Sequence, residues 1–375
     1  MFNTIIIGAG ISGLACANYL EKNDDEFLVI SKDIGGRILT SETGDVNYGA
    51  FFICSDYNHV LNYVSVNKRI RLKDFYFHEN EHIYSLFEPR IIPYISQFIK
   101  IDRILLKFRN HLHRMRKKTR MISQKSAIEQ DKFLYELYNK NAYQYVVEQN
   151  LMEGSNVYLS KALYSTTFSP LNNMNAFSFL QFLLPLITPI YTFTFEKEKM
   201  IHRFQDRIHI ATVKDIQYKD NFYRVKTDNK SFKAANIVLA TDITWSYKFA
   251  HVKIYNKPVQ TNMIHIRGKM TGVYKNKYYH LFSSTSNVQA IADLCDGTFL
   301  FYYKKDVSSL HDYFSNFNII YKKQWNPAGT INGHHLIESD RGNNMYLIGD
   351  YNIAGLEDSF ITGIYGAHKI IQQNQ

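Results

Sequence analysis

Short apolar runs and segments of helical spacing alternate along the chain. Residues 4–7 form an apolar run typical of a buried strand, and residues 15–20 after it have the spacing of a helix. Residues 26–30 indicate a second parallel strand, and residues 344–348 form a late apolar strand that leads into another helix. Strands that alternate with helices in this way predict a parallel sheet of the α/β class.

The middle of the chain has a different character. From about residue 56 to residue 195 helical spacing dominates, and apolar residues recur at i, i+3, i+4 and i+7. This spacing is carried by Ile101, Ile104, Leu105 and Phe108. Strand patterns then return, as antiparallel strands at 208–213, 222–227 and 231–233, a buried strand at 235–242, and a second sheet at 259–266 and 297–303.

A glycine motif lies where the first strand meets the first helix. Gly8, Gly10 and Gly13 have the G-x-G-x-x-G spacing. Gly8 permits a tight turn, Gly10 lets a pyrophosphate approach the backbone, and Gly13 lets the helix pack closely on the strand. The amides at the helix start, including those of Ile11 and Ser12, would face the diphosphate. The motif predicts dinucleotide binding.

The end of the second strand departs from the dinucleotide-binding pattern. An Asp or Glu is expected there, to bind the ribose hydroxyls of the adenosine. Ser31 occupies that position instead. Asp33 follows two residues later as a substitute, and Lys32 is placed to reach a phosphate. The ribose contact therefore stays open between these residues.

A second glycine pair makes the pattern more specific. Gly36 and Arg37 belong to a G-G-R sequence, and a glycine followed by aromatic residues comes about a dozen positions later. With the first motif, this order resembles the flavin-containing amine oxidase and phytoene desaturase superfamily. The resemblance implies that Arg37 lies on the FAD pyrophosphate. It also implies that the later segment runs beside the isoalloxazine ring, through Gly49, Ala50, Phe51 and Phe52.

The end of the chain and its middle extend the resemblance. An apolar strand ends in Gly349-Asp350, and the resemblance implies that Asp350 accepts a ribityl hydroxyl of FAD. The helix that follows would direct amides at the flavin C2 carbonyl and stabilise negative charge on the reduced ring. The matching positions are Phe360, Ile361 and Thr362 at that helix, Val213 at the adenine, and Ala240 and Thr241 beneath the cofactor.

These segments predict one interrupted domain. A Rossmann-like FAD-binding domain, with a parallel sheet like that of glutathione reductase, would combine residues 1–55, 196–255 and 335–375. An α+β substrate domain would be built from residues 56–195 and 256–334. Since no cysteine lies near the last helix, FAD is expected to be bound without a covalent link.

The resemblance implies an FAD-dependent oxidoreductase that removes a hydride from a small or medium-sized substrate, in particular an amine. Oxygen is the expected acceptor, because no second glycine fingerprint for NAD(P)H is visible. The catalytic candidates are Trp325, Lys269 and Lys304. The alternatives are a flavin mutase resembling UDP-galactopyranose mutase, with Arg267 and Arg341 as diphosphate ligands, a desaturase of an apolar substrate, and a non-enzymatic FAD-bound scaffold.

Composition limits the classes of binding partner that the protein is expected to have. The 375 residues carry a net charge of +10, which attracts anions, but no known nucleic-acid motif accompanies it. Basic residues concentrate at 100–125, which predicts either a solvated helix face or contact with an anionic membrane or acidic partner. Residues 176–195 are nearly all apolar, and we expect a buried, kinked segment lining a cavity rather than a membrane anchor.

The cysteine content bears on the compartment. Three widely spaced cysteines without a C-x-x-C pair indicate neither a disulfide framework nor a metal site. The short apolar run at the N-terminus lies inside the glycine motif and does not resemble a signal peptide. We therefore expect a reducing, cytoplasmic location, with membrane association as an option.

Overall fold

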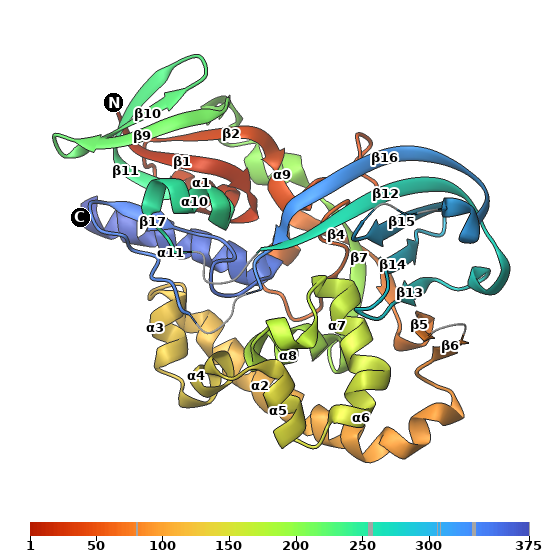
Figure 1. The fold of residues 1–375 in the computed structure, drawn as a ribbon. Coiled ribbons are helices and arrows are strands. Elements are labelled where there is room, and N and C mark those ends of the chain that lie inside the picture. The colour runs from red at the N-terminus through yellow and green to blue at the C-terminus, as the bar shows by residue number, and fades with distance from the viewer. Residues whose placement is uncertain (80–81, 254–257, 306, 308, 332–334, 375) are drawn as a thin grey trace.

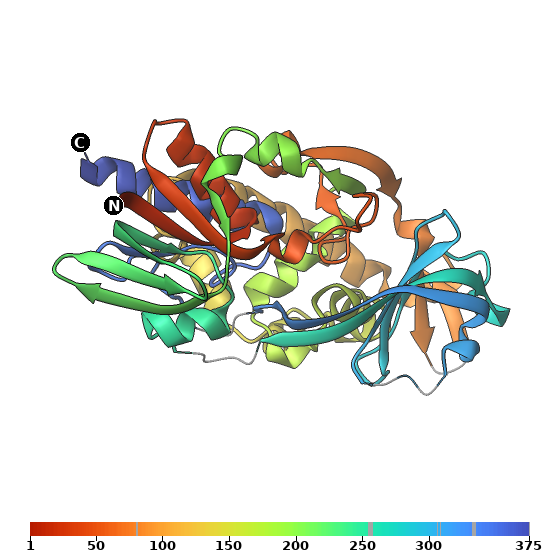
Figure 2. The same ribbon diagram turned by 90° about the horizontal axis from the view of Figure 1, so that it is seen from above.

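The computed structural model describes residues 1–79, 82–253, 258–305, 307, 309–331 and 335–374. Within them the strands form two large sheets and one small sheet. The first and second sheets lie side by side, and a layer of helices runs beneath both (Figure 1). Both termini lie at the first sheet, at the opposite end of the molecule from the second sheet (Figure 2).

The first sheet has a parallel core in the order β8–β2–β1–β11–β17. The start of β11 also pairs with an antiparallel hairpin of β10 and β9. These strands are β1 (Phe2–Gly10), β2 (Phe27–Gly35), β8 (Ile208–Ile210), β9 (Val213–Lys219), β10 (Phe222–Thr227), β11 (Ser231–Leu239) and β17 (Met345–Leu347).

Two strand expectations are corrected here. Residues 208–213 are not one antiparallel strand, because β8 pairs parallel with β2 and Val213 begins β9. Residues 231–233 and 235–239 form the single strand β11. Its first half is partly exposed beside the hairpin, whereas Ile237–Leu239 is buried. One strand that crosses two environments therefore has two hydrophobic patterns.

Helices α1 (Ile11–Glu21) and α11 (Leu356–Asn374) pack closely against each other beside the first sheet. The contact depends on Gly363, because a Cβ there would lie 2.3 Å from the carbonyl oxygen of Ser12. Leu14, Phe27 and Val238 belong to the core that this contact helps to enclose. Helix α11 is thereby held beside the glycine motif at the start of α1.

The second sheet has the order β16–β12–β15–β14–β13–β5–β6. The strands expected at 259–266 and 297–303 are present as the antiparallel pair β12 and β15. The bounds are β5 (Phe75–Glu79), β6 (His82–Ser85), β12 (Val259–Met270), β13 (Tyr279–Leu281), β14 (Val288–Asp293), β15 (Thr298–Tyr303) and β16 (Phe314–Gly329). The small sheet orders β3 (Ile53–Cys54), β7 (Ile190–Phe195) and β4 (Val64–Ile70).

The helical layer begins with the long helix α2, and side-chain caps start several of the helices after it. Asp131 accepts a hydrogen bond from the Leu134 amide and so caps α4, and Asn175 accepts one from the Ser178 amide and caps α8. The helices are α2 (Ile95–Lys118), α3 (Gln124–Glu129), α4 (Lys132–Asn139), α5 (Ala142–Glu148), α6 (Met152–Gly154), α7 (Ser160–Thr167) and α8 (Ala176–Leu183). Elsewhere lie α9 (Lys197–Ile201) and α10 (Ile243–Ala250).

The apolar segment 176–195 is not one continuous element. It forms the buried helix α8, a turn at Leu184–Leu186, and the strand β7 of the small sheet. Pro185 and Pro189 explain the division, because neither residue can continue a helix interior. Across the residues that the structure describes, no helix combines the length and the apolar character that a membrane crossing needs.

Candidate functional site

The turn between β1 and α1 is closed by glycines that leave no room for a side chain. Gly8 has a φ of +106°, and a Cβ on it would lie 2.5 Å from the carbonyl oxygen of Ala240. A Cβ on Gly13 would lie 2.0 Å from the oxygen of Gly8. Ala240, predicted to lie beneath the cofactor, therefore contacts the back of this turn.

Gly10 differs from its neighbours, because it faces open space. It is the N-cap of α1, and a Cβ built on it would meet no atom within 4 Å. The first turn of α1, which includes Ile11 and Ser12, contains no acidic residue. Its free amides and the positive end of the helix dipole are therefore available to an anion.

The end of β2 is tied to this turn through a serine. The Ser31 hydroxyl accepts a hydrogen bond from the Ala9 amide at 3.1 Å and donates to the Asp33 carbonyl at 2.6 Å. The side chains of Lys32 and Asp33 are exposed. The Ser31 hydroxyl therefore binds backbone groups of Ala9 and Asp33. The ribose contact expected in this stretch stays a prediction.

Arg37 and Asp350 meet beside the glycine turn, from opposite ends of the chain. Both guanidinium Nη atoms donate to the carboxylate in a bidentate ion pair. Arg37 belongs to the turn Gly36–Ile38. Gly36 has a φ of +56°, and a Cβ built on it would lie 3.2 Å from the Cα of Gly10. The two glycine turns therefore approach each other closely, and Arg37 directly follows Gly36 at this approach.

Asp350 is buried, whereas Arg37 is about one third exposed. Burial alone would raise the pKa of Asp350, but the charge and hydrogen bonds of Arg37 and the amide of Thr330, 3.1 Å away, outweigh it and lower that pKa. Asp350 is therefore an ionised acceptor at neutral pH. The exposed part of Arg37 can still reach a second anion.

The segment Gly49–Phe52 packs against the backbone of Arg37. A Cβ on Gly49 would lie 2.0 Å from the Arg37 carbonyl oxygen, which also accepts the Ala50 amide at 3.1 Å. Phe51 packs edge-on against Tyr279 of the second sheet, and Phe52 lies in the same apolar cluster. The segment therefore bridges the glycine turn and the second sheet.

Two other predicted cofactor residues lie at or near strand ends of the first sheet. Thr241 exchanges a hydrogen bond with Ser246 at 2.9 Å, and its carbonyl accepts the Tyr351 hydroxyl at 2.7 Å. Val213 is buried at the start of β9. Their contacts with an adenosine moiety stay predictions.

The start of α11 requires a correction. The helix begins at Leu356, after Gly355 with a φ of +148°, so the amides of residues 360–362 lie inside it rather than at its free end. Thr362 acts through its side chain instead. Its hydroxyl accepts the Gly349 amide at 2.8 Å and donates to the Ser359 carbonyl at 2.6 Å. Thr362 thereby fixes the residue that precedes Asp350.

Two buried acids, Glu357 and Asp358, occupy the first turn of α11. Glu357 accepts the amides of Asn58, His59 and Val60 at 2.9 to 3.1 Å. Burial raises the pKa of Glu357, but the His59 side chain and these amides outweigh it and lower the pKa. The acid therefore anchors the segment that leads into the small sheet.

Arg116 departs from the predicted solvated face of the basic helix. It is buried, and it binds Asp358 through Nε to Oδ1 at 2.9 Å and Nη2 to Oδ2 at 2.7 Å. Gln181 of α8 also donates to Asp358, at 3.2 Å. Arg116, although it lies within the basic run, therefore forms an ion pair inside the protein, because its side of α2 faces the interior.

An aromatic cluster joins the Gly49–Phe52 segment to the second sheet. Tyr48 and Tyr321 stack with ring centroids 4.6 Å apart, and Trp325 is buried in the same cluster. The Tyr48 hydroxyl lies 3.2 Å from Nδ1 of His265, and burial lowers the pKa of His265. Among the described residues, Trp325 Nε1 and His265 Nε2 find no hydrogen-bond partner. A cavity of about 230 Å³ lies against Phe51 and Tyr279.

The two lysine candidates lie outside this cluster. Trp325 pairs with Thr261 on β12, whereas Lys269 is exposed and pairs with Asn316, roughly 26 Å further along the strand at about 3.3 Å per residue. Lys304 is also exposed, with its Nζ 4.8 Å from the ring centre of Tyr164. The structure therefore separates Lys269 from Trp325 and gives neither lysine a place in the cluster.

Comparisons with known proteins agree with this geometry. The family model described as an NAD(P)-binding Rossmann-like domain matches residues 6–65. The horse (Equus caballus) flavin-containing amine oxidase A is 29% identical over 103 residues, which span 26% of this chain and 19% of that enzyme. The sequence match thus covers about a fifth of its relative.

Solved structures match over nearly the whole chain. Putrescine oxidase bound to putrescine has a TM-score of 0.67 at 12% identity, covering 99% of both chains. Cyclohexylamine oxidase from Brevibacterium oxydans has a TM-score of 0.66 at 14% identity, covering 100% of this chain and 99% of that one. A fatty acid isomerase from P. acnes has a TM-score of 0.68 at 12% identity, covering 99% and 98%. The chain has the flavin amine oxidase fold.

This fold confirms the predicted resemblance and the α/β class. The relatives and the Rossmann-like domain support FAD as the cofactor. The residues present fit that group, since Gly10 leaves open space at an uncompensated helix N-terminus. Beside it, Arg37 supplies a cation for phosphate and Asp350 an ionised acceptor for a hydroxyl.

Proposed function

We propose that this protein of the flavin amine oxidase fold is an FAD-dependent oxidoreductase that removes a hydride from a small or medium-sized amine, with oxygen as the acceptor. The observation that carries the proposal is the convergence of Gly10, Arg37 and Asp350 on one site, from the first turn, the second glycine pair and the last strand. The amine oxidases among the related proteins support the substrate class.

Each residue of this site would hold a different part of the cofactor. The amides at the start of α1 beside Gly10 would bind the diphosphate, and Arg37 would compensate its charge. Asp350 would accept a hydroxyl of the ribityl chain. When bound, FAD supplies the ring that accepts two electrons from the substrate, so no separate acid–base pair is required of the protein. We propose that FAD is held without a covalent bond.

The aromatic cluster supports an amine as the substrate. Tyr48 and Tyr321 stack on each other, and the outer face of each ring carries the negative part of the ring quadrupole, which attracts an ammonium group. Trp325 and His265 each present a nitrogen without a partner among the described residues, so polar contacts remain available at the same place. We propose that this cluster binds the substrate and excludes water from it.

The second candidate is hydride removal from an apolar chain. The fatty acid isomerase of the same fold favours it, as do the apolar residues around Phe51 and Tyr302. The mutase candidate gains no support, because Arg267 is exposed on β12 and Arg341 instead donates to the Ala250 carbonyl at 3.5 Å.

An anaerobic substrate screen tests the proposal. The FAD-loaded protein is mixed without oxygen with primary amines, with unsaturated fatty acids and with UDP-galactopyranose, and the flavin absorbance is followed. We expect amines to bleach the flavin, and oxygen to restore the colour with release of hydrogen peroxide. Bleaching by fatty acids alone would replace the amine proposal by the second candidate. Isomerisation of the sugar nucleotide without net bleaching would overturn both.

A further inference from the structure

An apolar stripe on the outer side of α2 remains exposed. Ile95, Ile99 and Leu106 recur at helical spacing on this side and are 40% to 51% exposed. Just before the helix, Phe87 and Ile92 are more exposed still, at 67% and 63%. Large apolar side chains gathered in this way are uncommon on a surface that faces only water.

This stripe is separate from the face by which α2 packs on the protein. The core side of α2 consists of Ile101, Leu105, Phe108, Leu112 and Met115, all buried. With about 100° between successive residues, the exposed stripe lies roughly 140° around the helix from that side. Helix α2 therefore has one apolar face that packs on the core and a second apolar face that is exposed at the protein surface.

A line of basic side chains runs between these two faces. Its members recur at three- and four-residue intervals, so they share one flank of the helix. They are Lys100, Arg103, Lys107, His111, Arg114 and Lys118. Of these, Lys100, Arg103, Arg114 and Lys118 are exposed and have no ion-pair partner within the part of the chain that the structure describes.

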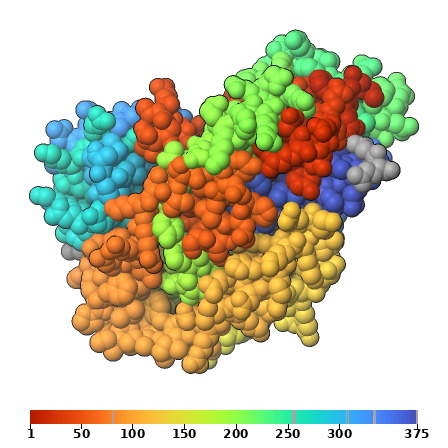
Figure 3. Space-filling model, turned by 180° about the vertical axis from the view of Figure 1, so that it is seen from behind, coloured from red at the N-terminus to blue at the C-terminus, as the bar shows by residue number. Residues whose placement is uncertain are grey.

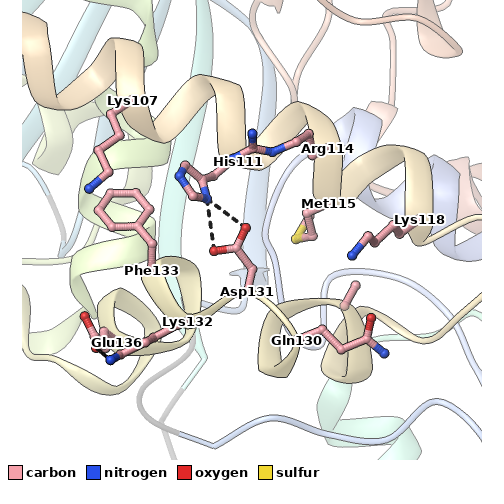
Figure 4. Close-up of a pocket in the computed structure, with 11 residues that line it drawn as sticks. Lys107, His111, Arg114, Met115, Lys118, Gln130, Asp131, Lys132, Phe133 and Glu136 are labelled. Carbon is pink, nitrogen blue, oxygen red and sulfur yellow. Dashed lines mark hydrogen bonds and ion pairs between the residues drawn. The ribbon is translucent and has the colours of Figure 1, made fainter.

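A cavity of about 510 Å³ lies along this line, between α2 and the segment of α3 and α4. Figure 4 shows Lys107, Arg114 and Lys118 on its upper side. Two acids also line the cavity. Asp131 lies 2.8 Å from Nδ1 of His111 and accepts the Leu134 amide at 3.2 Å, and Glu136 lies 4.0 Å from Nζ of Lys132. The cavity therefore has room and positive charge for a phosphate group.

We propose that this face of the protein docks on an anionic phospholipid bilayer. The exposed apolar stripe enters the interfacial layer, the basic line contacts the headgroups, and a lipid phosphate occupies the cavity. Figure 3 shows the orange and gold surface of this region across the lower half of the molecule. A lipid surface fits better than an acidic protein, because the face combines aliphatic side chains with cations. This proposal does not depend on the redox reaction.

Vesicle sedimentation tests the proposal. The full chain is mixed with vesicles of phosphatidylcholine alone or of phosphatidylcholine with phosphatidylglycerol. We expect binding to the anionic vesicles only, weakened by salt. Arg114→Gln/Lys118→Gln should lower the affinity about fivefold for each cation removed. Ile95→Ser/Ile99→Ser should lower it further while leaving the salt dependence in place.

Matched controls keep the test falsifiable. Lys214→Gln/Lys219→Gln removes the same charge from the exposed β9 strand and should leave vesicle binding unchanged. Since all of the substituted side chains are exposed, the midpoint temperature of thermal unfolding should not change. Absence of binding to anionic vesicles would overturn the proposal, as would equal binding to neutral ones. Retention on immobilised polyglutamate without vesicle binding would overturn it in favour of an acidic protein partner.

Discussion

Arg116 on α2 and Asp358 in the first turn of α11 form a bidentate ion pair in the protein interior, 242 residues apart in sequence. Their side chains are 7% and 1% exposed. The charge of Asp358 raises the pKa of Arg116, although burial alone would lower it. The pair joins the helical layer to α11, the helix that follows the last strand of the first sheet.

Removing one partner of this pair should destabilise the protein strongly. Arg116→Met leaves the Asp358 carboxylate buried without its cation, and we expect the free energy of unfolding to fall by about 3–5 kcal/mol. Urea unfolding measures the change. Arg116→Met/Asp358→Leu should recover part of the loss, because neither charge then remains. Lys117→Met, at an exposed neighbour, serves as the control. An Arg116→Met protein as stable as the original would contradict this account.

The glycine turn allows cofactor binding to be separated from folding. In Gly10→Val the new side chain enters open space, so the fold should keep its stability while FAD binding is lost. In Gly13→Ala the Cβ would lie 2.0 Å from the Gly8 oxygen, so the fold itself should be destabilised. Thermal unfolding without cofactor and FAD titration together measure both effects. FAD affinity unchanged in Gly10→Val would show that the diphosphate does not bind there.

A buried histidine pair should make stability depend on pH. His78 on β5 and His280 on β13 lie 2.8 Å apart between Nε2 and Nδ1. Burial lowers the pKa of His78 to about 3 and that of His280 to about 4, from 6.5. The unfolded chain therefore binds protons between pH 6.5 and pH 4 that the folded one does not. Stability should be full above pH 6.5 and fall below it, by up to about 1.4 kcal/mol per pH unit for each histidine.

Denaturant unfolding between pH 7 and pH 4 measures this dependence. His78→Phe/His280→Leu replaces both partners by apolar side chains, so its stability should fall less steeply over the same range. His311→Gln, at an exposed histidine outside the pair, should leave the slope unchanged. Equal slopes in the double variant and the original protein would assign the pH dependence to other groups.

Local patterns predicted the parts of the fold that depend on neighbouring residues. The apolar run before Gly8 and the helix after Gly13 are present, because a buried strand, a tight turn and a helix each leave their own spacing. Ile101, Leu105 and Phe108 are buried on one side of α2, as their period requires. The strand pair around 259–266 and 297–303 was predictable for the same reason.

Long-range partners were not visible in this way. The burial of Arg116 depends on Asp358, and no local pattern connects the two residues. A weak signal existed, because Arg116 lies four residues after Leu112 on the core side of the helix. Ser31 was expected near a ribose, and its hydrogen bond with the Ala9 amide depends on how β1 and β2 are aligned. Lys269 was a catalytic candidate because neither the length nor the register of β12 was known.

The absorption spectrum of the purified protein tests the central claim most directly. It is recorded before and after heat denaturation, on the protein as isolated and after incubation with FAD. The account predicts a flavin spectrum, with FAD released into the supernatant on denaturation and none left attached to the protein. A colourless protein that FAD cannot reconstitute would contradict the roles of Gly10, Arg37 and Asp350 together.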